Sequence, residues 1–355
     1  MKTPLYRLLF VCLVLVFMTA NAQAADKELV VQTWGGETEK GMKLAFWNKF
    51  EEETGIKIVG VTAGGDLMGR VAAQVKSGNV EWDICWPPDI ASVEAAAKEG
   101  LLEPIDYSIV TNTKDLIAGA VTKYGVGSEA SSLLVTYNKN VFPGNNHPNS
   151  WADFYNPEKF PGARANDDNW AGPVYHYFSA LLADGVPPDK VVPIDYARAF
   201  KVLDRIKPHV KVWYSSGDKV MQVLIDQEVV MAKTTDMRAS KAISLGAPTA
   251  VVWNQALIFQ DYFCVLKGAP HKEAAMRFIN LTTRPDLQAK YMEYMKVSTV
   301  NQKALDFLSP GEGKKLLLYP DNLKKAVNTF TEKNIQWLVD HQTEMLEKWN
   351  AWLSK

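Results

Sequence analysis

The sequence has no long apolar run after its first twenty residues and almost no excess of charge of either sign. Its 39 Lys and Arg residues are balanced by 40 Asp and Glu residues, a formal net charge of −1. A membrane-spanning helix needs about 20 apolar residues, and phosphate binding needs a surface excess of Lys and Arg. We therefore exclude a multi-span transporter and a nucleic-acid-binding protein. The length of 355 residues allows two globular units.

Cysteine and the common catalytic motifs are also scarce. Of the three Cys residues, Cys12 lies in the first apolar run, and Cys85 and Cys264 lie in strand-like apolar segments. Such segments favour small buried hydrophobic side chains, although a pairing of Cys85 with Cys264 stays open. The sequence contains no G-x-S-x-G, H-E-x-x-H or C-x-x-C motif and no Tyr-Tyr pair. We therefore expect a protein that is not an enzyme and has no metal and no cofactor, with a secreted hydrolase as the alternative from another class.

The first 24 residues have the pattern of a secretory signal peptide. Lys2 and Arg7 flank the start, an eleven-residue apolar run covers 8–18, and Ala22-Gln23-Ala24 provides small residues at a cleavage site. The apolar run is too short for an anchor helix. We expect cleavage after Ala24 and export to the periplasm.

Strand-like and helix-like segments alternate after the signal peptide. Strands are expected at 27–34, 56–61 and 80–86, and helices at 40–54, 67–75 and 90–99, with Gly55 and Gly78 ending the first two helices. This order predicts an α/β fold with a doubly wound parallel sheet, which binds ligands at the carboxyl ends of its strands. The turns after Trp34 and Trp86 lie at these ends.

The second half repeats this pattern. Strands are expected at 132–138, 163–166, 229–232, 251–254 and 261–266, and helices at 174–183, 196–206, 219–226 and 323–353. A stretch rich in Pro, Gly and Asn at 142–149 is the expected crossing point between two lobes.

Eight segments resemble the spermidine/putrescine-binding branch of the periplasmic solute-binding proteins that serve ABC importers. They follow one another in the family's order over the whole mature chain, at 50–57, 82–84, 149–154, 166–168, 258–261, 272–280, 298–301 and 318–321. The resemblance implies a type II periplasmic binding protein fold, with two α/β lobes and a ligand cleft between them. Lobe one would comprise 28–136 plus 262–307, and lobe two 139–259 plus 310–355. It also implies a monomer that delivers its ligand to an inner-membrane permease driven by an ATPase.

The same resemblance assigns two carboxylates to the cleft, Asp168 and Asp261. An ammonium group in a dry cleft needs carboxylates, and aromatic faces favour cations. Asp168 could instead cap a helix, but the adjacent Asp167 could do that. The expected ligand-binding residues are Trp34, Trp86, Asp89, Asp168, Trp170, Asp236, Arg238, Phe259 and Asp261.

The sequence also departs from the family pattern. Ala171 replaces a second carboxylate, Phe259 replaces a tryptophan, and Asp89 replaces a tyrosine. Arg238 could hold a ligand carboxylate, or it could pair with Asp236 or with a surface acid. Acids outnumber bases among these residues, which favours an amine such as putrescine or spermidine. A short ω-amino acid such as 4-aminobutyrate, or another small organic solute, is the alternative ligand.

Overall fold

The computed structural model describes residues 28–63, 66–169 and 171–355. The predicted signal peptide and Trp170 lie outside these residues. In the described part of the chain, no helix is both long and apolar enough to cross a membrane.

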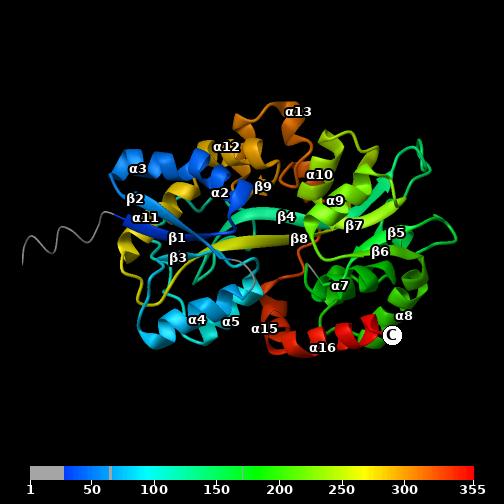
Figure 1. The fold of residues 1–355 in the computed structure, drawn as a ribbon, viewed down its shortest axis with the longest axis horizontal. Coiled ribbons are helices and arrows are strands. Elements are labelled where there is room, and N and C mark those ends of the chain that lie inside the picture. The colour runs from blue at the N-terminus through cyan, green and yellow to red at the C-terminus, as the bar shows by residue number, and fades with distance from the viewer. Residues whose placement is uncertain (1–27, 64–65, 170) are drawn as a thin grey trace, which may run out of the picture.

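A mixed sheet of nine strands forms the centre of the described structure (Figure 1). Its strand order is β2-β1-β3-β8-β4-β7-β5-β6, and the short β9 pairs with β4. The strands are β1 Glu28–Thr33, β2 Lys57–Thr62, β3 Ile84–Cys85, β4 Val126–Asn138, β5 Arg164–Asp167, β6 Val210–Tyr214, β7 Met231–Thr235, β8 Thr249–Val265 and β9 Ser298–Thr299.

Helices cover both faces of this sheet, as a doubly wound fold requires (Figure 1). On the β1 side, α2 and α3 lie over one face, and α4 and α5 lie over the other. The α-helices are α2 Gly36–Met42, α3 Asn48–Thr54, α4 Leu67–Ser77, α5 Ile90–Lys98, α6 Trp151–Phe154, α7 Val174–Ala183, α8 Tyr196–Ile206, α9 Gly217–Ile225, α10 Asp236–Ser244, α11 Lys272–Thr282, α12 Pro285–Met295, α13 Pro310–Gly313, α14 Pro320–Leu323, α15 Glu332–Asp340 and α16 Gln342–Leu353. A π-helical turn, Lys43–Trp47, joins α2 to α3.

Lobe one is built on β2, β1 and β3, where the sequence pattern was strongest. β1 pairs in parallel with both β2 and β3, as expected for a β-α-β arrangement. Gly55 and Gly78 end α3 and α4 in the left-handed conformation, with φ of 72° and 73°. Glycine adopts this conformation without the steric cost of a Cβ, so both helix ends were predictable.

Two long antiparallel strands, β4 and β8, connect lobe one with lobe two, which is built on β7, β5 and β6. The sequence predicted two separate strands at 251–254 and 261–266, but β8 runs unbroken from Thr249 to Val265. It absorbs a register shift opposite Leu133–Val135, where Gln255 has φ of 60°. β4 already pairs with β7 from Leu133 onward, so the stretch at 142–149 lies inside lobe two and is not the crossing point. The proposed boundaries of the lobes remain a prediction.

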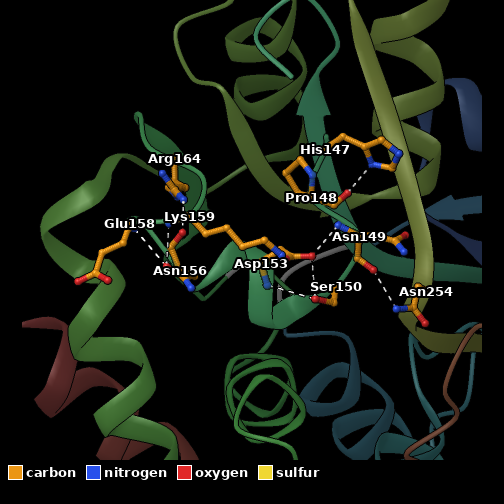
Figure 2. Close-up of polar contacts among 10 residues, drawn as sticks. All are labelled: His147, Pro148, Asn149, Ser150, Asp153, Asn156, Glu158, Lys159, Arg164 and Asn254. Carbon is orange, nitrogen blue, oxygen red and sulfur yellow. Dashed lines mark hydrogen bonds and ion pairs between the residues drawn. The ribbon is translucent and has the colours of Figure 1, made fainter. Parts of the chain in front are cut away.

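The segment 149–154, one of those that resemble the binding-protein family, has a structural role (Figure 2). Ser150 accepts a hydrogen bond from the Asp153 amide at 3.2 Å and so caps α6. The Asp153 carboxylate accepts from the Asn149 amide at 2.9 Å and pairs with Lys159 at 2.8 Å. Asn254 of β8 donates to the Asn149 carbonyl at 2.8 Å. These contacts fix the loop to the connecting strand.

The C-terminal part differs from the single helix expected at 323–353. Residues 325–327 instead run beside β8, where the Gln255 amide donates to the Lys325 carbonyl and the Ile258 amide to the Val327 carbonyl, both at 2.9 Å. Two helices follow, α15 and α16, which meet at His341. The spacing of the apolar residues in 323–353 is helical, so it did not predict this backbone pairing. The pattern also missed β6, in which only Tyr214 is buried and the other residues are partly buried or exposed.

Cys85 and Cys264 lie directly opposite each other on β3 and β8 and are fully buried with free thiols. The Leu266 amide donates to the Asp83 carbonyl and the Tyr262 amide to the Pro87 carbonyl, at 3.1 and 2.9 Å. Because hydrogen-bonded pairs alternate along an antiparallel ladder, the two cysteines also occupy a hydrogen-bonded position. Cβ atoms are farther apart there than in a non-hydrogen-bonded pair, which disfavours a disulfide. The expectation of small buried hydrophobic side chains is therefore confirmed.

Candidate ligand site

The carboxyl ends of the parallel strands of both lobes carry the candidate residues. Trp34 follows β1, and Asp89 lies in the turn after β3 and caps α5. In lobe two, Asp168 follows β5, and Asp236 opens α10 directly after β7. This is the edge at which doubly wound sheets bind ligands, as the sequence predicted.

At this edge, the Asp261 carboxylate of β8 lacks a partner for its negative charge. It is half-buried, and its side chain has no hydrogen-bond or ion-pair partner among the described residues. Burial raises the pKa of Asp261 well above its usual value, and the negative charges of Glu129 and Asp89 raise it further. An unpaired carboxylate beside other carboxylates is a poor arrangement for the empty protein. A ligand cation would relieve it.

Glu129, on β4, is a second acid of this group that the sequence analysis missed. It accepts a hydrogen bond from the Tyr291 hydroxyl of α12. Burial raises the pKa of Glu129 to about 7, and the charge of Asp236 contributes. The only sequence signal was a lone glutamate among small and apolar residues, three positions before the strand expected at 132–138. We name Asp89, Glu129 and Asp261 the acid group.

Aromatic residues from both lobes border the acid group. Asp89 lines a small cavity with Phe259, Tyr262 and Phe330, of about 10 Å³, which is room for about one water. Tyr175 of α7 packs against Phe259 and Phe330, with ring centroids 6.1 and 5.6 Å apart. Burial, followed by the charges of Asp89 and Asp261, raises the pKa of Tyr175 well above its usual value. Tyr175 therefore reaches from lobe two toward the acid group, which its sequence position in the first turn of α7 could have suggested.

The two predicted tryptophans that the structure describes differ in exposure. Trp34 is 36% exposed at the end of β1. Trp86 is only 1% exposed, and its indole N–H donates to the Ser128 hydroxyl at 2.6 Å. Ser128 in turn donates to the Asp261 carbonyl at 3.2 Å. Trp86 thus lies behind the acid group and supports the backbone at Asp261, whereas the Trp34 side chain is exposed.

Asp236 is already well satisfied by the protein. It is 3% exposed, and its Oδ1 accepts from the Ser131 hydroxyl at 2.5 Å, the Ser132 amide at 3.1 Å and its neighbour Met237 at 3.0 Å. Burial raises its pKa to about 6 in spite of these bonds. Asp236 therefore ties α10 to the connecting strand β4.

Arg238 does not pair with Asp236. Its Nη1 lies 2.8 Å from Asp218 of α9, a carboxylate that is 79% exposed. Its Nε is buried and has no hydrogen-bond partner among the described residues. Other buried polar atoms are also without a partner in the described structure, namely both amide atoms of Asn166 in lobe two and the Ser132 hydroxyl of the connecting strand β4. Buried polar atoms are rarely left unpaired in native proteins. The lobe-two edge thus offers donors that a ligand acceptor can use.

The raised pKa values predict that the empty protein loses stability as the pH rises. Glu129 and Asp236, with pKa values of about 7 and 6, bind protons in the folded state that they release when unfolded near pH 4. Where the native state binds more protons, stability falls with rising pH. His176, whose pKa burial lowers to about 4, acts in the opposite direction over the same pH range. We therefore expect urea unfolding to give a free energy roughly 2 kcal/mol lower at pH 8 than at pH 5, and Glu129→Gln to reduce this difference. Glu293→Gln, an exposed change on α12, is the control, and an equal pH slope in wild type and Glu129→Gln would contradict the assignment.

Comparison with known proteins supports this description of the fold. The pattern of the family described as bacterial extracellular solute-binding protein matches residues 45–317. A gamma-aminobutyric acid-binding protein of Pseudomonas aeruginosa is 30% identical over 343 residues, which is 95% of this chain and 94% of that protein. A spermidine/putrescine-binding periplasmic protein of Escherichia coli strain K12 is 26% identical over 301 residues, covering 82% of each chain.

A solved structure gives the same result. The structure of the Atu4243-GABA receptor superposes with a TM-score of 0.81 at 33% identity, covering 92% of this chain and 98% of that one. The two-lobed type II fold and the resemblance on which it was predicted are both confirmed. The names of these relatives describe proteins that bind small solutes. The chain belongs to the family of bacterial extracellular solute-binding proteins.

Proposed function

We propose that this protein is the periplasmic binding component of an ABC importer and that it binds a short ω-amino acid such as 4-aminobutyrate. The signal peptide at 1–24 is removed on export, and the mature monomer delivers its ligand to an inner-membrane permease with a cytoplasmic ATPase. It binds its ligand without converting it. The ligand lies between the lobes, with its ammonium group at Asp261 and Asp168 and its carboxylate at Arg238.

The observation that carries this proposal is the Asp261 carboxylate. It is half-buried, lacks a partner among the described residues and lies within the electrostatic reach of Glu129 and Asp89. An ammonium group would turn this repulsion into attraction, and Phe259 and Tyr175 beside it suit a cation and a methylene chain. Asp168, which follows β5 in lobe two, supplies a second carboxylate from the opposite lobe.

The other end of the ligand decides between the two ligand classes. A diamine needs another acid there, but Oδ1 of Asp236 already accepts from three donors of the protein, which leaves only Oδ2 for a ligand. A carboxylate instead meets the buried, unpartnered Nε of Arg238 and the unpartnered amide of Asn166. The names of two relatives contain gamma-aminobutyric acid or GABA, which supports an ω-amino acid as the first candidate ligand.

Putrescine or spermidine is the second candidate. Asp89 favours it, because this half-buried carboxylate accepts hydrogen bonds only from Ala91 and Ser92 at the start of α5 among the described residues, with the Ser92 amide at 2.7 Å, and burial raises its pKa. It could serve as the acid for a second ammonium group. The name of the Escherichia coli relative supports this alternative.

Calorimetry with three four-carbon ligands separates these possibilities by charge alone. The mature chain, unfolded and refolded to remove bound solute, is titrated with 4-aminobutyrate, putrescine and succinate. We expect 4-aminobutyrate to bind at least tenfold more tightly than putrescine and succinate to bind weakest, because two anionic ends would face the acid group. Tightest binding of putrescine would replace this proposal with the second candidate. No binding of any of the three would refute both.

A further inference from the structure

The C-terminal helix α16 has an unexpected connection to the candidate site. It lies beneath lobe two beside α7 and α8, as Figure 1 shows. Its Trp349 is fully buried, and the indole N–H donates to the backbone carbonyl of Asp168. Asp168 is the proposed lobe-two contact to the ligand, so a residue 181 positions away in sequence holds its backbone.

Beneath Trp349 lies a closed cluster of three titratable side chains that are 0% exposed. The Lys233 ammonium lies 2.8 Å from Asp167 Oδ1 and 2.8 Å from His176 Nδ1, and His176 Nε2 lies 3.2 Å from Asp167 Oδ2. Because Lys233 can only donate, Nδ1 accepts, and the proton of the neutral imidazole resides on Nε2 and points to Asp167. Asp167, Lys233 and His176 are named the lobe-two cluster.

Charge balance fixes the protonation of this cluster at neutral pH. Burial lowers the pKa of His176 to about 4, so the imidazole is neutral. Burial opposes the ionised form of Asp167, but the neighbouring His176 and Lys233 outweigh it and lower the pKa of Asp167 below its usual value. One carboxylate and one ammonium group therefore compensate each other in the interior, with the imidazole between them.

The cluster and Trp349 together fix the turn that presents Asp168. The imidazole of His176 stacks on the Trp349 ring, with centroids 3.7 Å apart and an interplanar angle of 14°. Asp167 Oδ2 also accepts from the Ala171 amide at 3.3 Å, which spans the turn. The turn is thus held at the Asp167 side chain, at the Asp168 carbonyl and at the Ala171 amide. The Asp168 carboxylate itself accepts from the Asn169 amide at 2.6 Å and is half-exposed.

We propose that Trp349 and the lobe-two cluster are positioning residues for the ligand site: they hold the backbone at Asp167 and Asp168 so that the Asp168 carboxylate faces the ligand. The inference rests on the proposed role of Asp168 in ligand binding. It explains why two strong polar groups, Lys233 and Asp167, are buried in lobe two although neither lies at the surface of the cleft. Affinity for the ligand then depends on a helix that does not touch the ligand.

Two matched substitutions on α16 test the proposal. Trp349→Phe removes the indole N–H that reaches Asp168 but retains a ring to stack on His176. Trp352→Phe makes the same chemical change three residues later, where the indole N–H donates to Asp204 of α8 at 2.7 Å. Each variant loses one indole hydrogen bond and a similar ring volume, and the acceptor lost in Trp352→Phe is the charged one. A purely structural role therefore predicts no greater effect on binding in Trp349→Phe than in Trp352→Phe.

We expect Trp349→Phe to weaken ligand binding about three- to tenfold and Trp352→Phe to leave it unchanged, with similar shifts in melting temperature. His176→Gln, which retains a donor for Asp167 and an acceptor for Lys233 but removes the stacked ring, should weaken binding to the same degree. Equal affinities in Trp349→Phe and Trp352→Phe would overturn the proposal.

Hydrogen exchange of the empty protein distinguishes this inference from the proposed function. In Trp349→Phe, the peptide covering 166–172 should exchange several-fold faster than in wild type, and in Trp352→Phe it should not. If the wild type binds none of the three ligands, the proposed function fails, and the exchange rates still decide whether Trp349 holds the turn. Unchanged exchange in Trp349→Phe would overturn the inference whatever the ligand.

Discussion

Asp261→Asn is expected to lower ligand affinity by about 2–5 kcal/mol, or roughly thirty- to several-thousand-fold in Kd. The substitution removes the charge that the ligand ammonium would neutralise and retains the shape of the side chain. The loss should be the same for 4-aminobutyrate and putrescine, because both present an ammonium group. Isothermal titration calorimetry of wild type and variant measures it directly.

The same substitution should not destabilise the empty protein. Asp261 has a pKa raised by burial and by the charges of Glu129 and Asp89, so its ionised form opposes folding at neutral pH. We expect Asp261→Asn to unfold at an equal or higher urea concentration than wild type at pH 8. Asp306→Asn, on an exposed part of lobe one, is the control that should change neither property. Unchanged affinity in a folded Asp261→Asn would remove Asp261 from the site.

Much of the fold could be predicted from the sequence because local signals agreed with each other. In lobe one, glycines ended the helices where expected, and Asp89 capped α5 in the turn after β3. Lobe two was predicted less well at its edges. The extended pairing of 325–327 with β8 depends on a partner about 70 residues away, so the apolar period alone suggested one long helix. Long-range backbone pairing leaves little trace in local periodicity.

The candidate site was predictable only where a residue's position determined its role. Strand ends placed Trp34 and the turn with Asp89 at one edge of the sheet, whereas Asp168 was assigned by the family resemblance. Glu129 and Tyr291 were missed, because the hydrogen bond between them joins residues 162 positions apart. The count of acids also assigned Asp236 to the ligand. Its actual donors, Ser131 and Ser132, lie more than 100 residues earlier on β4, so no local sequence pattern indicated them. The preference for an amine rested on that count, and the contacts of Asp236 are the reason for weighting the ω-amino acid above it.

Replacing Arg238 is expected to change the affinities for the two ligand classes in opposite directions. If the ligand carries a carboxylate, Arg238→Ala should weaken 4-aminobutyrate binding by about 2 kcal/mol, near thirty-fold, because a partly buried charge-assisted bond is lost. Putrescine binding should stay equal or improve, since a positive charge leaves the cleft. The cost in stability should be below about 1 kcal/mol, because the Arg238–Asp218 pair is exposed on the Asp218 side.

Asp218→Asn breaks the same ion pair but retains the guanidinium, so it should leave 4-aminobutyrate binding equal or tighter. Loss of 4-aminobutyrate affinity in Asp218→Asn as large as in Arg238→Ala would mean that the ion pair, and not a contact to the ligand, maintains the site. Weakened putrescine binding in Arg238→Ala would likewise contradict a carboxylate-specific role for Arg238.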